Sequence, residues 1–130
     1  MPGFLYILLI VTSLIMIGIG LPMALGKVPQ NNWYGFRFPV TMRSQEAWDT
    51  ANRQYGWWLV LAGVLSLPIP IVWWCAGWGV DLVWIYVVMM AGPTLLGILP
   101  SLRSAYRAEA QAKADKADND QDAVPEHFRS

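Results

Sequence analysis

The chain has 130 residues and no net charge, because nine Lys and Arg residues balance nine Asp and Glu residues. These charges are unevenly distributed: residues 1–26, 54–80 and 82–102 contain none. A soluble domain needs charge on the outer face of each helix, whereas an uncharged apolar run of about 18 or more residues is typical of a membrane span. The pattern excludes an ordinary soluble enzyme and a basic nucleic-acid-binding protein, and it predicts a small multi-pass membrane protein.

The three uncharged runs predict three transmembrane helices. A helix rises 1.5 Å per residue, so ~20 residues cross a hydrocarbon core of ~30 Å. We place the spans at about residues 4–25, 55–74 and 82–102. The first run begins without a basic residue and ends without a clear cleavage site, so we expect a retained span rather than a signal peptide. The predicted fold class is an all-α membrane protein: a three-span domain over residues 1–102, with a structured cytoplasmic loop at 27–53, and a cytoplasmic tail at 103–130.

A short connection joins the second and third spans. Gly77 and Gly79 favour a tight turn over residues 75–81. Asp81 lies directly before the third span, where it is suited to cap the helix N-terminus. Cys75 is the only cysteine, so an intrachain disulfide is excluded, and we expect it to be a small buried apolar side chain.

The tryptophans support these limits. Trp57 and Trp58 lie at one end of the second span, and Trp73 and Trp74 lie at the other. Sixteen residues of helix separate the two pairs by ~24 Å, which is the spacing expected of two interfacial aromatic belts. We therefore expect most of the eight tryptophans to be membrane anchors.

The distribution of basic residues predicts the orientation, because Lys and Arg near span ends favour the cytoplasmic side. The connection between the second and third spans has no Lys or Arg. The connection between the first two spans and the tail both carry them, and in a three-span protein these two segments lie on the same side. We therefore predict an external N-terminus and a cytoplasmic C-terminus. The basic residues of the first connection are Lys27, Arg37, Arg43 and Arg53.

The predicted spans contain few polar side chains. Proton relays and ion pathways usually place a carboxylate, His or Arg at membrane depth, and the predicted spans have none. This argues against a transporter that functions alone. Glycines allow close helix approach and prolines bend helices, so we assign packing roles to both. The residues are Gly18, Gly20, Gly63, Gly92, Gly97, Pro68, Pro70 and Pro93.

The loop divides into two parts. Up to Met42 it is rich in Pro, Asn and Gly, which predicts an irregular conformation. From Ser44, a suitable N-cap, it reads as a helix that lies on the inner leaflet or runs straight into the second span. One helical face combines Ala47, Trp48, Ala51 and Tyr55, and the opposite face combines Glu46, Asp49 and Arg53, with Asp49 and Arg53 as an expected ion pair.

The loop also carries a recognisable motif. Residues 28–37 read VPQNNWYGFR, and Pro39, Thr41, Ser44, Glu46, Trp48, Asn52 and Arg53 follow in order. This pattern resembles the signature of the SdpI family, bacterial multi-pass membrane proteins named for an immunity protein against a secreted toxin. The resemblance covers about residues 5–102. Gln30 stands where the family usually has a second proline, and the founding protein has additional N-terminal spans that this sequence lacks.

The resemblance and the residue chemistry together suggest roles for the motif. We expect Arg37 to be central, with its guanidinium paired with Glu46 or Asp49, or bound to a lipid phosphate. Amide side chains would bridge loop backbone, a glycine would hold a turn, and two aromatic side chains would pack the loop against the membrane surface. The alternative is that the motif only folds the loop over the helix ends. The candidate site residues are Asn31, Tyr34, Gly35, Arg37, Glu46, Trp48 and Asn52.

The tail begins with helix-forming residues. Glu109 and Lys113 form a favourable pair four residues apart, so the third span is expected to continue as a helix to about Lys116. From Asp118 the composition becomes acidic, and we expect disorder. His127, the only histidine, is expected to be solvated rather than to bind a metal.

Three functional hypotheses remain open. The first is a non-enzymatic SdpI-type protein of the bacterial inner membrane, acting in toxin immunity or signalling by binding a partner at the inner membrane face. The second is a structural accessory subunit of a larger membrane complex, and the third is a small transporter or channel formed by oligomerisation. We predict no cofactor, because no nucleophile–base pair, metal cluster or phosphate-binding motif is present. The expected partners are membrane lipid and a protein partner or a homo-oligomer, without nucleic acid.

Overall fold

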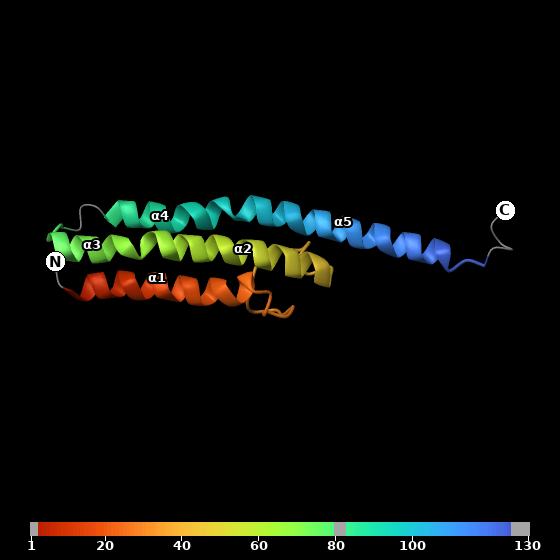
Figure 1. Cartoon of the computed structure of the whole chain (residues 1–130), viewed down its shortest axis with the longest axis horizontal. Helices are drawn as coiled ribbons and strands as arrows, with labels where there is room; N and C mark the ends of the chain where they lie inside the picture. The colour runs from red at the N-terminus through yellow and green to blue at the C-terminus, as the bar shows by residue number, and fades with distance from the viewer. Residues whose placement is uncertain (1–2, 80–82, 126–130) are drawn as a thin grey trace.

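The computed structural model describes residues 3–79 and 83–125, which form five helices joined by irregular segments (Figure 1). The predicted all-α fold class is confirmed: three helical rods are long and apolar enough to cross a membrane, namely Gly3–Ala24, Gln45–Ala76 and Val83–Asp122. A short interruption divides each of the last two rods. The helices are α1 (Gly3–Ala24), α2 (Gln45–Ser66), α3 (Pro68–Ala76), α4 (Val83–Leu96) and α5 (Ile98–Asp122).

The middle rod lies at the centre of the bundle. In Figure 1, α2 and α3 run between α1 on one side and α4 and α5 on the other. A third of the most apolar window of the middle rod is buried, against 17% and 11% in the outer two. Both outer rods pack on α2, and their outward faces expose many large apolar side chains. Such outward apolar faces suit a lipid environment.

One helix start follows an expected alternative, and one helix end differs from the prediction. The loop helix runs straight into the second span, which was one of the two expected arrangements, so α2 is continuous from Gln45. The third rod continues to Asp122, so the expected disorder from Asp118 is wrong for residues 118–122. The extension is rich in alanine and contains no glycine or proline, and Lys113 pairs with Glu109 at 3.1 Å. These features stabilise a helix that composition alone suggested would end earlier.

Prolines account for the interruptions within the two long rods. Pro70 and Pro100 have no N–H to donate to the carbonyl groups four residues earlier, at Ser66 and Leu96. The helix assignment therefore breaks at Leu67 and at Gly97, although both residues keep right-handed helical backbone angles.

The α3 helix ends in the predicted turn. Gly77 adopts a left-handed conformation with φ of 67°, and its N–H caps the carbonyl groups of the last helical turn. Cys75 is exposed, so the expectation that it is buried is wrong: its position in an apolar run did not show which side of the helix it occupies. Asp81, the expected helix cap, and His127, the expected solvated side chain, lie outside the described residues.

Glycines bring α1 and α2 into backbone contact. A Cβ atom built on Gly20 would lie 2.8 Å from the carbonyl oxygen of Gly56, and one on Gly63 would lie 2.9 Å from the carbonyl oxygen of Ser13. Gly56, which the sequence analysis missed, faces the backbone of α1 in the same way. The expected packing role is wrong for Gly18 and Gly92, because nothing lies within 4 Å of a Cβ at either position.

Three hydroxyl groups link the three rods inside the bundle. The Ser13 Oγ lies 3.0 Å from both the Ser66 Oγ and the Tyr86 Oη, and Tyr86 also donates to the carbonyl oxygen of Leu9 at 2.8 Å. All three side chains are buried. Because each hydroxyl has partners, the group can lie within an apolar layer and hold the rods in register.

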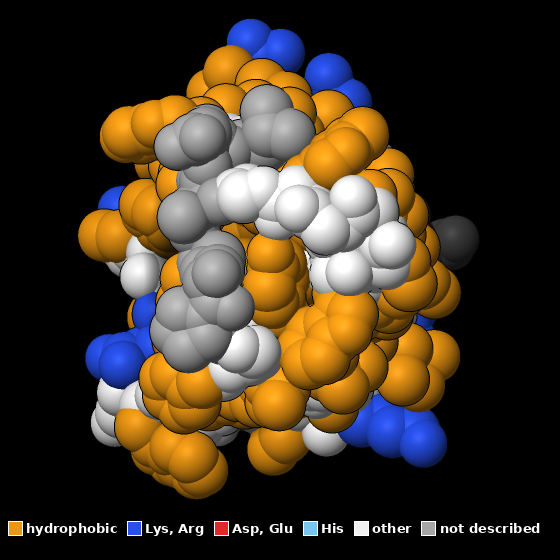
Figure 2. Space-filling model, turned by 90° about the vertical axis from the view of Figure 1, so that its left-hand side faces the viewer, with side chains coloured by type: hydrophobic (Ala, Val, Ile, Leu, Met, Phe, Trp, Pro, Cys, Tyr) orange, Lys and Arg blue, Asp and Glu red, His pale blue; other side chains and the backbone are white. Residues whose placement is uncertain are grey.

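The end of the bundle that carries the α3–α4 connection, which we call the turn end, is hollowed. Figure 2 shows a depression there with a hydrophobic floor. A cavity of about 360 Å³ is lined by Gly3, Tyr6, Trp74, Gly77, Trp78 and Gly79. The Tyr6 hydroxyl donates to the carbonyl oxygen of Trp78 at 2.7 Å, which ties the start of α1 to the connection.

The tryptophans differ in exposure. Five are exposed, as expected of membrane anchors: Trp33, Trp57, Trp74, Trp78 and Trp84. Trp48 and Trp73 are buried, so an anchoring role is wrong for these two. Trp58 is half-buried and packs against Gly97 with part of its surface.

Candidate functional site

The motif loop lies at the opposite end of the bundle, which we call the loop end, and Asn31 fixes its first turn. The Asn31 Oδ1 accepts hydrogen bonds from the backbone N–H groups of Trp33 and Tyr34, at 3.0 and 2.6 Å. Its Nδ2 donates to the carbonyl oxygen of Pro29 at 2.8 Å. An asparagine that bonds to nearby backbone in this way sets a tight turn. The side chain therefore does bridge loop backbone, as the sequence analysis expected.

Asn52 of α2 also holds the loop through hydrogen bonds to backbone groups. Its Oδ1 accepts from the backbone N–H of Phe36 at 2.7 Å, and its Nδ2 donates to the carbonyl oxygen of Trp48 at 2.9 Å. Gly35 lies against this side chain with φ of 111°, in a region that only glycine adopts readily. A Cβ on Gly35 would lie 2.5 Å from the Asn52 Oδ1. The expected turn role of Gly35 therefore has both a conformational and a steric basis.

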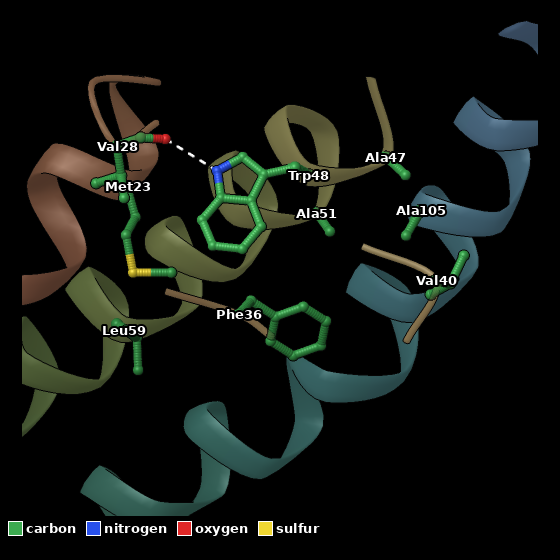
Figure 3. Close-up of a cluster of buried hydrophobic side chains, with 9 residues drawn as sticks. All are labelled: Met23, Val28, Phe36, Val40, Ala47, Trp48, Ala51, Leu59 and Ala105. Carbon is green, nitrogen blue, oxygen red and sulfur yellow. Dashed lines mark hydrogen bonds between the residues drawn. The ribbon is translucent and has the colours of Figure 1, made fainter. Parts of the chain in front are cut away.

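Trp48 is the centre of the loop core. It is fully buried, and its Nε1 donates to the carbonyl oxygen of Val28 at 2.9 Å (Figure 3). The expectation that Trp48 packs the loop against the membrane surface is wrong, because the loop folds over this side chain and encloses it. The core around it combines α1, the loop, α2 and α5: Met23, Val28, Phe36, Val40, Ala47, Ala51, Leu59 and Ala105.

Two further polar side chains close the loop. Thr41 is buried, and its hydroxyl lies within hydrogen-bond distance of the Phe36 and Phe38 carbonyl oxygens and of the Phe38 N–H. The Gln30 Nε2 donates to the carbonyl oxygen of Met42 at 2.9 Å and so joins the two ends of the irregular segment. In the sequence, Gln30 is notable only as a departure from the family pattern. Here the amide provides a cross-link that proline cannot make.

Tyr34 attaches the loop to the side of α1. Its hydroxyl donates to the carbonyl oxygen of Ile19, five residues before the end of that helix. Burial raises the pKa of the Tyr34 hydroxyl above its ordinary value of 10.0, so the group remains a neutral donor at physiological pH. The partly buried Tyr34 thus packs on α1 rather than solely against a membrane surface.

The expected pairing of Arg37 is wrong. Arg37 is exposed, and within residues 3–79 and 83–125 it forms no ion pair with Glu46 or Asp49. Both carboxylates are exposed, and Asp49 accepts a hydrogen bond from Gln45 at 2.8 Å instead of pairing with Arg53. The spacing of these residues suggested contacts that the side chains do not make, because the loop turns Arg37 outward.

Arg43 makes the ionic contact that holds the loop to α5. Its Nη1 lies 3.7 Å from the Glu109 Oε2, and Glu109 also pairs with Lys113. The Glu109 side chain is only 10% exposed, whereas the Arg43 side chain is 58% exposed. The contact joins the last part of the loop to the helix that extends beyond the third span.

We predict that Arg43→Ala loosens the loop more than Arg37→Ala. Loss of the Arg43 contact should cost up to about 1 kcal/mol, because one partner is largely exposed. Loss of Arg37 removes no protein contact seen here. Hydrogen exchange of residues 38–44, measured in a neutral detergent, should therefore accelerate in Arg43→Ala and remain unchanged in Arg37→Ala. Equal acceleration in both variants would contradict this assignment.

A polar cleft lies beside the loop core, between the first turns of α2 and the extension of α5. Its volume is about 580 Å³, and it is lined by Glu46, Thr50, Ala108, Gln111, Ala112, Asp115, Lys116 and Asn119. Of the predicted site residues, only Glu46 lines it; the other six belong to or flank the loop. No group of three His, Cys, Asp or Glu residues in the described part of the chain is placed to hold a metal ion. The chemistry offered is hydrogen bonding and mixed charge, which suits binding.

One comparison with known proteins covers the loop. A model of the SdpI/YfhL protein family matches residues 27–101, which is more than half of the chain and includes the whole irregular loop. No curated protein and no solved structure matches the chain. The match contains the buried tryptophan, both bridging asparagines and the positive-φ glycine that hold the loop together. On this evidence the chain belongs to the SdpI/YfhL family.

Proposed function

We propose that this protein is a non-enzymatic, SdpI-type protein of the bacterial cytoplasmic membrane. Its loop end faces the cytoplasm, and its N-terminus lies outside. Support for this orientation comes from the basic residues near the span ends, which are concentrated at the loop end, as the positive-inside rule requires. The protein acts in immunity to an envelope toxin or in the associated signalling, by binding a partner at the inner membrane face.

The observation that carries this proposal is the polar cleft between α2 and α5. It lies beside the loop core, because its lining residues alternate along α2 and α5 with core residues such as Ala47, Ala51 and Ala105. Thr50, Gln111 and Asn119 offer hydrogen-bonding groups, and Glu46, Asp115 and Lys116 add charge. A few convergent polar groups in a preformed cleft are typical of a binding site.

A matched pair of variants tests the cleft. Ala112 lines it, whereas Ala110 is exposed on the same helix and does not. Ala112→Trp should fill the cleft and abolish protection of cells against the toxin at unchanged protein abundance, while Ala110→Trp should leave protection intact. The assay is survival of a deletion strain that expresses each variant and is challenged with the peptide toxin of the same species. Full protection by Ala112→Trp, or no sensitivity in the deletion strain, would refute the proposal.

A second candidate function is supported by a different feature. An apolar groove of about 330 Å³ lies between α1 and α4, lined by Met16, Tyr86, Val87, Met90, Ala91, Thr94 and Leu95. A groove of this kind fits a structural accessory subunit that packs against a helix of a larger membrane complex. Stoichiometric co-purification with such a complex in mild detergent would favour this function, and a single species in which this chain is the only protein would exclude it.

A further inference from the structure

The loop turn, residues 31–37, contributes no residue to the cleft and has an outer surface of its own. Trp33 is 84% exposed, which makes it the most exposed large hydrophobic side chain of the described residues. The backbone beneath it is fixed by the hydrogen bonds of Asn31 and Asn52. The hydrogen-bonded turn therefore holds the Trp33 side chain outward, and packing within this protein does not explain why a tryptophan stands there.

The hydrogen bond of Tyr34 sets the level of this turn along the bundle. The hydroxyl reaches the carbonyl oxygen of Ile19, which lies about 7.5 Å along the axis before the end of α1 at Ala24. The Trp33 ring is 6.3 Å from the Tyr34 ring. The Tyr34 side chain therefore reaches back along α1, while the backbone of the turn lies at the loop end, next to Asn52 of α2.

A second exposed tryptophan lies near the same level. Trp57 is 55% exposed and follows Gly56, whose carbonyl oxygen faces Gly20 of α1. At the turn end, Trp74 contacts Gly3, the first residue of α1. Ile19 is sixteen positions after Gly3, about 24 Å along the helix, and Ala24 lies about 32 Å from Gly3. A hydrocarbon core that begins at Gly3 and is about 30 Å thick therefore ends between Ile19 and Ala24. This end lies near Trp57 and the loop turn, so Trp33 and Trp57 belong to one aromatic belt at the loop end.

The charge of the segment matches this position. Residues 25–45 contain Lys27, Arg37 and Arg43 and no acidic residue. Arg43 is paired with Glu109, but Lys27 and Arg37 are exposed and have no ion-pair partner among the described residues. The acidic residues of α2 and α5 lie further from the spans. The cationic, tryptophan-bearing side of the loop is thus complementary to a surface of anionic lipid headgroups.

We propose that the turn at residues 31–37 is a membrane-surface anchor, with Trp33 inserted at the headgroup level and Arg37, aided by Lys27, bound to the phosphates of anionic lipids. The turn faces the bilayer beside α1, whereas the cleft opens between α2 and α5. This inference needs only the span limits and does not depend on toxin immunity.

The test uses the full-length protein in nanodiscs of phosphatidylcholine, with and without phosphatidylglycerol. The measured quantity is hydrogen exchange of loop residues 27–42. Anionic lipid should slow this exchange about fivefold in the wild type, which is the contribution of one basic side chain near such a surface. Arg37→Gln should remove this response, whereas Lys116→Gln, the same charge change far along α5, should retain it.

The depth of the Trp33 segment in the membrane is measured with a spin label. In a Cys75→Ser background, a spin label at Asn32→Cys should report headgroup depth, and the same label at Asp118→Cys should report water. Replacing Trp33 with Ala should move the label at position 32 toward water. An unchanged response in Arg37→Gln would overturn the proposal, and so would a water-exposed label at position 32. An equal response to inorganic phosphate in neutral nanodiscs would also overturn it, because a free anion rather than a lipid surface would then be the ligand.

Discussion

Replacement of Gly56 with valine should separate α1 from α2 and lower the free energy of unfolding by about 3 kcal/mol. At this position a Cβ atom would meet the backbone nitrogen of Ala24, and it would lie 2.7 Å from the carbonyl oxygen of Gly20. Neither neighbour is the end of a flexible side chain, so the helices themselves must move apart. Gly56→Ala should show a smaller loss in the same direction, of about 1 kcal/mol.

The matched control for Gly56 is Gly18→Val. Gly18 lies in α1, and nothing is within 4 Å of a Cβ built there. This substitution should leave stability unchanged or raise it slightly, because valine has a higher helix propensity than glycine. The measurement is reversible unfolding of the detergent-solubilised protein by a denaturing detergent. If Gly18→Val and Gly56→Val lose stability equally, the cause is not close contact between α1 and α2.

This contrast also shows what the sequence could predict about the spans. Their existence follows from uncharged runs that only a membrane accommodates, and the structure has three rods of the required length. The faces of the rods do not follow in the same way. Because α1 has no charged residue and its neighbouring hydroxyl residues Thr12 and Ser13 point to different sides, the sequence does not indicate how α1 is rotated, and Gly18 could not be distinguished from Gly20.

In the loop, local interactions were predictable and distant ones were not. Asn31 and Gly35 act on backbone within a few residues, so residue type and spacing are sufficient to indicate their roles. The partner of Arg43 is Glu109, which lies on the third rod and comes beside the loop only when the bundle is assembled. Arg37 was assigned to nearby carboxylates because they were close in sequence.

For Trp48, the sequence predicted the helix face but not the segments that cover it. Its place on the apolar face of the loop helix, with Ala47 and Ala51, was correctly predicted, and all three residues are fully buried. What covers that face was not predictable from a helical period. The irregular segment supplies Val28, Phe36 and Val40, and α5 supplies Ala105, so the expected contact with lipid is replaced by contact with protein.

Trp48→Ala should therefore be among the most destabilising single changes in the loop end, with a loss of about 3–5 kcal/mol. The substitution leaves a cavity between α1, the loop and α2, and it removes the donor that satisfies the buried Val28 carbonyl group. Trp48→Phe separates these two effects. It retains most of the apolar volume but not the Nε1–H group, so its loss should be about 1–3 kcal/mol.

The control for Trp48 is Trp57→Ala on the same helix, where the side chain is 55% exposed and should contribute little to unfolding in detergent. Hydrogen exchange gives a second readout, because the cavity should release residues 27–42 while the glycine contacts between α1 and α2 remain protected. Exchange that increases equally along the whole of α1 would contradict a core confined to the loop end. A Trp48→Ala variant as stable as Trp57→Ala would show that the loop does not depend on this core. In that case the packing of the loop motif against the first and third rods would not depend on the buried Trp48 side chain.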